Sequence, residues 1–94
     1  MIVLRIDSDI KELTIEMANT EDNKSAILFP VAKSKENKQS VFVFSDEDVL
    51  ENSISADSEF VSKNNTLRKE YKVEEGFYAL YVPKSKMCYL CELK

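Results

Sequence analysis

The clearest candidates for chemistry in this sequence are Cys88 and Cys91, because they form a CxxC motif. Two thiolates at this spacing can bind Zn²⁺ or cycle as a disulfide. The surrounding residues are aromatic and aliphatic, which favours a strand, and residues i and i+3 of a strand face opposite sides. We therefore expect the sulfurs to diverge and both cysteines to be buried apolar side chains, with no metal and no cofactor.

Carboxylates are the second candidate group, because the chain contains no histidine. That absence removes the usual general base and the Ser–His and Cys–His nucleophile pairs. Asp7 and Asp9 share a turn and four acids cluster at 46–51, where they could hold Mg²⁺ or act as acid and base. A solvated turn and a helix start explain the same residues. We expect no enzyme activity, with a metal-dependent carboxylate enzyme as the weakest alternative.

The segment from 46 to 59 holds six acidic residues and no lysine or arginine. An acidic surface of this kind can imitate nucleic-acid phosphates and occupy a basic groove of another protein, with fast and salt-dependent association. An ordinary solvated helix face is the simpler interpretation. The predicted protein-binding residues are Asp46, Glu47, Asp48, Glu51, Asp57 and Glu59.

Aromatic and basic residues alternate in the last third of the chain and support a different function. A sheet that presents such rings could stack unpaired bases while the cations contact the backbone. The alternative is that the rings form the core and the cations its rim, since the aromatic residues fall on both faces. Nucleic acid is therefore the less favoured partner. The residues concerned are Arg68, Lys69, Tyr71, Lys72, Tyr78, Tyr81, Lys84, Lys86 and Tyr89.

The element that must position many of these residues is a hairpin of two apolar runs, 77–82 and 87–93, around the polar loop 83–86. A short polar loop that begins with proline is typical of a turn between strands. Neither face of this hairpin alternates with polar residues, so both faces need cover from a second layer, from barrel closure or from another chain. The expected pairs are Val82–Met87, Leu80–Tyr89 and Tyr78–Cys91.

The rest of the chain reads mainly as strands. Residues 19–25 are expected to form a polar loop and residues 33–40 a charged connection, while a short helix covers about 46–54 with Val49, Leu50 and Ile54 as its buried stripe. The other expected strands cover 2–6, 12–17, 26–32, 41–44, 59–62 and 67–73.

The predicted fold is α+β and predominantly antiparallel β in a single domain, 1–94. We expect a strongly bent six- to seven-stranded sheet or a small barrel, with the helix plugging one opening. An open sheet with the helix on one face is the alternative, and it leaves the other face for a homodimer or a partner. Ninety-four residues suffice for one hydrophobic core without disulfides.

Localisation and function follow from composition. No apolar run approaches the roughly 20 residues of a membrane span, so no membrane contact is expected. The first residues lack the basic stretch of a secretory signal, and two cysteines suit a reducing cytoplasm.

The leading hypothesis is a small, non-enzymatic, cytoplasmic protein-binding module with a host or cognate protein as partner. We envisage a phage or mobile-element inhibitor that acts through the acidic patch, an apolar sheet face, or both. A single-stranded nucleic-acid-binding domain is the alternative.

Overall fold

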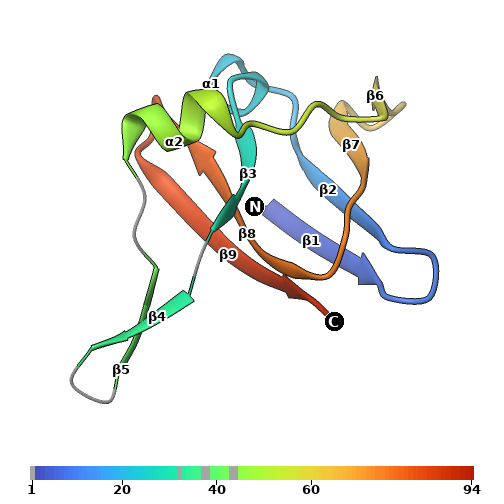
Figure 1. Cartoon of the computed structure of the whole chain (residues 1–94). Coiled ribbons are helices and arrows are strands. Elements are labelled where there is room, and N and C mark those ends of the chain that lie inside the picture. The colour runs from blue at the N-terminus through green and yellow to red at the C-terminus, as the bar shows by residue number, and fades with distance from the viewer. Residues whose placement is uncertain (1, 32, 37–38, 43–44) are drawn as a thin grey trace.

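Antiparallel strands account for most of the architecture (Figure 1), which is described by a computed structural model. It describes residues 2–31, 33–36, 39–42 and 45–94, with the backbone alone for 33–36, 39–42, 46 and 48. The elements are β1 (Ile2–Asp7), β2 (Glu12–Ala18), α1 (Glu21–Lys24), β3 (Ile27–Val31), β4 (Lys33–Glu36), β5 (Gln39–Phe42), α2 (Asp46–Glu51), β6 (Ser58–Val61), β7 (Thr66–Lys72), β8 (Gly76–Val82) and β9 (Met87–Leu93).

The first sheet has the strand order β1-β2-β7-β6, with all neighbours antiparallel. Its inner face is set by the alternation of polar and apolar residues along β2, where Leu13, Ile15 and Met17 are buried. Ile15 lies opposite Lys69 of β7, so the register brings the row of Leu67, Lys69 and Tyr71 onto the same inner face. The predicted two-residue period of both strands is confirmed.

The second sheet has the order β3-β8-β9, and its hairpin has the predicted pairs of Val82 with Met87 and of Tyr78 with Cys91. β8 is the central strand, and its residues from 78 to 80 are buried on both faces. Within the single chain, β9 lacks full cover, because Cys88 is exposed and Leu90 is 51% exposed, so the predicted cover by another chain stays a prediction for this strand.

The main core lies between these two sheets. It joins residues of β2 and β7, such as Leu13 and Leu67, to residues of β3 and β8, such as Leu28 and Leu80. β1 and β9 approach each other at one margin, but they belong to different sheets and do not pair. The described strands therefore form two facing sheets and a separate β4–β5 hairpin, without the closed small barrel that was one of the two predicted forms.

Two elements were not predicted. In the expected loop 19–25, Thr20 caps α1 by accepting a hydrogen bond from the Asn23 backbone N–H at 3.1 Å. In the expected connection 33–40, β4 and β5 pair with each other and extend away from the body (Figure 1). Of the expected strand 41–44, residues 41–42 belong to β5, and 43–44 lie outside the described residues.

The predicted helix is shorter than expected, and its stripe is different. α2 ends at Glu51 because the chain then turns to β3, where the Ile54 backbone N–H donates to the Leu28 carbonyl at 2.7 Å. Val49 is buried, but Leu50 is 74% exposed and does not belong to the core.

Candidate functional site

The outer face of the β3-β8-β9 sheet, which looks away from the main core, is almost entirely apolar. It is built by the two-residue period of three strands whose registers place matching positions side by side. Only the last of its nine positions carries a charge. The nine positions of this face are Ile27, Phe29 and Val31 on β3, Phe77, Ala79 and Tyr81 on β8, and Cys88, Leu90 and Glu92 on β9.

The helix α2, of six residues, packs on part of this outer face. Val49 is 4% exposed and packs with Phe29 and Ala79, both fully buried, to form a small second cluster. That cluster involves β3 and β8 and does not reach β9. Tyr81 of β8 packs against the cluster and is half-buried, whereas Cys88 and Leu90 of β9 lie beyond it and are exposed. We call these three residues the β9 face.

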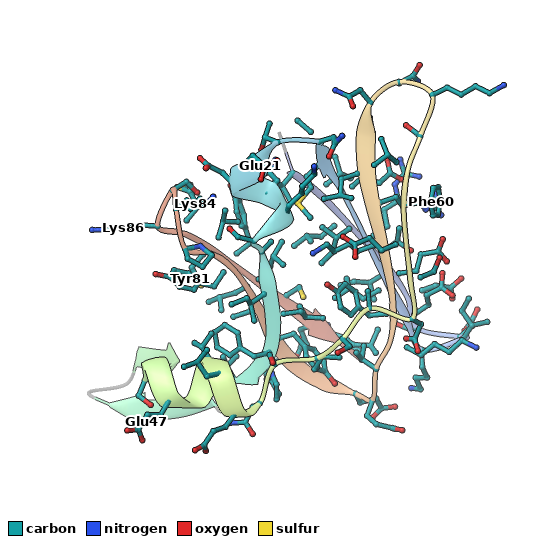
Figure 2. All side chains as sticks on the ribbon, turned by 90° about the horizontal axis from the view of Figure 1, so that it is seen from above. Glu21, Glu47, Phe60, Tyr81, Lys84 and Lys86 are labelled. Atoms are coloured by element: carbon teal, nitrogen blue, oxygen red, sulfur yellow. The ribbon has the colours of Figure 1, made fainter. Side chains whose placement is uncertain are left out.

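The β9 face has positive charge at one end and negative charge at the other. Lys84 and Lys86 belong to the turn that precedes β9, and Glu92 is near the end of the strand; all three are exposed. Figure 2 shows Tyr81 on the same side of the molecule as the two lysines, with Glu47 of α2 further along that side. The arrangement is an apolar centre with a charged rim, as in the core and rim of protein interfaces.

The predicted acidic patch falls into two groups. Glu47 and Glu51 are exposed on α2, and Glu47 lies on the opposite side of the molecule from Phe60, the neighbour of Glu59 (Figure 2). Asp57 accepts the Lys72 backbone N–H at 2.6 Å, and Glu59 lies 3.8 Å from the Lys69 ammonium group. Only the backbone is described for Asp46 and Asp48.

The predicted aromatic and basic set is divided between the core and three surfaces. Tyr71 and Tyr78 are buried, and the Tyr78 hydroxyl donates to the Glu74 carbonyl at 2.6 Å. Lys69 is also buried in the main core. Arg68 and Lys72 face outward from the β1-β2-β7-β6 sheet, whereas Tyr81 and Tyr89 belong to opposite faces of the other sheet and Lys84 and Lys86 to its turn.

The CxxC motif has diverging sulfurs, as predicted, because Cys88 lies opposite Tyr81 and Cys91 lies opposite Tyr78. Burial raises the pKa of both thiols, which keeps them protonated at neutral pH. The prediction that both are buried is wrong for Cys88, which is exposed, and Cys91 is only half-buried. No cluster of three or more metal-ligating side chains occurs among the described residues.

A second surface, the outer face of the β1-β2-β7-β6 sheet, carries charges of both signs. Glu16 lies 3.7 Å from Arg5 and 3.6 Å from Arg68, and Arg68 also pairs with Glu70 at 3.3 Å. The Arg68 guanidinium stacks over the Phe60 ring at 5.8 Å. An open depression of about 300 Å³ borders this network beside Glu16. The ion pairs largely neutralise one another, so this face has no single charge sign to attract a polyanion.

Comparisons with known proteins add no assignment. No protein-family model matches the chain, and neither curated protein sequences nor solved structures gave a significant match. In the part of the chain that the structure describes, no helix has the length and apolar character needed to cross a membrane.

Among the exposed apolar residues that sequence reasoning did not place in a site, Leu90, Cys88 and Leu50 belong to β9 and α2. The available signal was the run from Met87 to Cys91, which has no charged residue in an end strand. A strand at a sheet edge is usually interrupted by a charge or a proline.

Proposed function

We propose that this chain is a protein-binding module that docks on another protein through the β9 face. The observation that carries the proposal is the incomplete cover of an apolar sheet face, of which α2 protects the centre and leaves Tyr81, Cys88 and Leu90 in contact with water. Soluble domains rarely leave such a surface open unless a ligand or a partner occupies it. The action we envisage is occupation of a partner's surface, which requires no reacting group.

The energetics favour a small, well-defined contact. Leu90 is already half-buried, so completing its burial contributes about 1 kcal/mol, and Tyr81 is the type of residue that dominates interface energies. The lysines at one end and the glutamates at the other contribute mainly orientation and rate of association.

Nucleic acid is the less favoured ligand for this surface. Tyr71 and Tyr78, two of the rings that could have stacked with bases, are in the core. Of the predicted cations, Lys84 and Lys86 lie on the same side of the molecule as Tyr81 (Figure 2), and Glu92 of β9 and Glu47 of α2 lie near the same sheet face. A phosphate backbone that approaches Tyr81 would meet these carboxylates, which opposes binding.

Site-specific photocrosslinking tests the proposal. A benzophenone amino acid is placed at position 90, and the same group is placed at position 10 as a control, since Ile10 is an exposed apolar residue in the β1–β2 turn. We expect a discrete protein adduct from position 90 and none from position 10 in lysate of the source cell. Equal labelling from both positions, or an adduct with nucleic acid alone, contradicts the proposal.

A further inference from the structure

Building on the docking function proposed above, we infer that the partner on the β9 face is a second copy of this chain. The two β9 strands pair antiparallel across a two-fold axis and join two three-stranded sheets into one of six strands. The observations that lead to this occupant are the open edge of β9, the run of five residues without charge or proline along it, and the placement of charge at its two ends.

β9 is an edge strand, because it pairs with β8 on one side and is the last strand of its sheet. β1 approaches from the other sheet without pairing with it. Edge strands are commonly protected by lysine, proline or a bulge, and the edge strand β3 contains Pro30. The five residues from Met87 to Cys91 include no charge and no proline. This edge therefore has the character of one that pairs.

The charges of the strand are complementary to those of an inverted copy. Lys86 directly precedes β9 and Glu92 lies six positions later. Lys86 is the last residue of the turn, with a φ of 57°, and so lies just outside the ladder. When Tyr89 faces Tyr89 of the second copy, the turn that carries Lys86 in each chain lies beside Glu92 of the other, and this contact occurs twice. Opposite charges on facing positions of a sheet stabilise the pairing, and like charges oppose it.

The same charges select the register. If Leu90 instead faces Leu90 of the second copy, Lys86 meets Lys94 and Cys88 meets Glu92, which is unfavourable at both ends. Glu92 already has Lys94 of its own chain at 3.9 Å, but both side chains are substantially exposed, so this contact competes weakly.

The favoured register also places the exposed apolar residues of the two copies side by side. Cys88 and Leu90 of one chain lie opposite Leu90 and Cys88 of the other, on the side of the sheet that α2 leaves open. The interface is isologous, since the same strand serves both partners, and it closes after two copies.

A charge-exchange series followed by sedimentation equilibrium tests the inference. The unchanged protein is expected to dimerise, and Lys86→Glu or Glu92→Lys alone to raise the dimer Kd by about tenfold or more, because each creates two like-charge contacts. The double variant restores the wild-type Kd. An equal mixture of the two single variants forms heterodimers, since the altered residues then face opposite charges. Lys63→Glu, an equal charge change in the distant β6–β7 turn, leaves the dimer unchanged.

Three results would overturn the inference: wild-type protein that stays monomeric up to millimolar concentration, single variants that dimerise as the wild type does, or mixed single variants that stay monomeric. Circular dichroism of each variant checks folding, and the double variant shows whether the substitutions are tolerated together. A monomeric protein whose position 90 crosslinks to a different protein disproves the dimer and leaves the proposed function standing. A monomer without any adduct from position 90 removes both.

Discussion

Lys69 brings an ammonium group into the space between the two larger sheets, where a charge is costly. Its side chain is 8% exposed, and its Nζ lies 3.8 Å from Glu59 Oε1 and donates to the Ala26 carbonyl at 3.4 Å. Both contacts are long, and a buried ion pair needs good geometry to offset the loss of hydration. The aliphatic stem, in the row of Leu67 and Tyr71, is therefore the part of this residue that stabilises the core.

Two substitutions separate the stem from the charge. Lys69→Met keeps the volume and removes the charge, so we expect the free energy of unfolding to stay the same or to rise by about 1 kcal/mol. Lys69→Ala removes the stem and should lower it by about 2 kcal/mol. Urea titrations measure both. A methionine variant as unstable as the alanine variant would show that the ammonium contacts hold the sheets together.

Tyr71 makes stability sensitive to alkaline pH. Burial first, and the Glu59 carboxylate second, raise the pKa of Tyr71 from 10.0 to about 12. Between these values the unfolded chain has lost the phenolic proton that the folded protein still holds. Fewer protons are then bound in the unfolded state, so the stabilisation present below pH 10 is lost as pH rises toward 12.

Replacing Tyr71 with Phe should reduce the loss of stability at alkaline pH. Urea midpoints of the wild type fall between about pH 9 and about pH 11, and those of Tyr71→Phe fall less, because the buried phenol is the group that titrates. Tyr78, whose pKa burial also raises, accounts for a remaining decline. Equal losses in the two proteins would mean that Tyr71 does not couple folding to pH in this range.

At the scale of elements, Asp57 lengthens the β6–β7 ladder beyond the strand itself. Its backbone N–H donates to the Glu70 carbonyl at 2.8 Å, and its Oδ2 accepts the Lys72 backbone N–H at 2.6 Å. Asp57→Ala should cost about 1 kcal/mol of stability and speed hydrogen exchange at Lys72, because it removes the acceptor. Asp57→Asn keeps an acceptor oxygen and should preserve both values. If the asparagine variant loses partner binding while its stability is unchanged, the Asp57 carboxylate contacts the partner, as the predicted acidic patch requires.

The final hairpin could be predicted to the residue because its information is local. Two strand-like runs flank one four-residue polar turn, so pairing Val82 with Met87 fixes every later pair, including Tyr78 with Cys91. β2 and β7 were predictable for a related reason, since their alternation leaves one choice of inner face. The cap of α1 was equally local, but in a run of seven polar residues Thr20 does not differ from an ordinary loop residue.

The candidate site was not predictable in the same way, because it depends on which elements cover which. Leu50 and Val49 are adjacent on a short apolar stripe, and only the packing of α2 on Phe29 and Ala79 decides that Val49 is buried. Cys88 and Leu90 look like core residues in the sequence. They are exposed because the small cluster ends at β8 and does not extend over β9. The strand β4 and its pairing with β5 were missed because lysine and glutamate, which dominate β4, have low strand propensity.

At the scale of the whole molecule, two apolar clusters of different size govern which parts open together. The larger cluster joins β2 and β7 to β3 and β8 and contains Leu80, so its loss is the unfolding of the protein. The smaller one consists of Phe29, Val49 and Ala79 on the other side of the β3-β8-β9 sheet. Among the α2 side chains that the structure describes, Val49 alone is buried in this cluster, and local opening of such an element need not disturb the main core.

Native-state hydrogen exchange on two core variants tests this division. Val49→Ala should lower the opening free energy of α2 amides by about 1–2 kcal/mol and leave exchange in β2 and β7 nearly unchanged, because it acts on the small cluster alone. Leu80→Ala should lower protection in β2, β7 and β8 by about 3 kcal/mol, since it removes a side chain that both sheets share. If Val49→Ala instead lowers protection in β2 and β7 as much as in α2, the two clusters unfold as one unit. Phe29 and Ala79, which α2 covers, would then become accessible to water only when the whole protein unfolds.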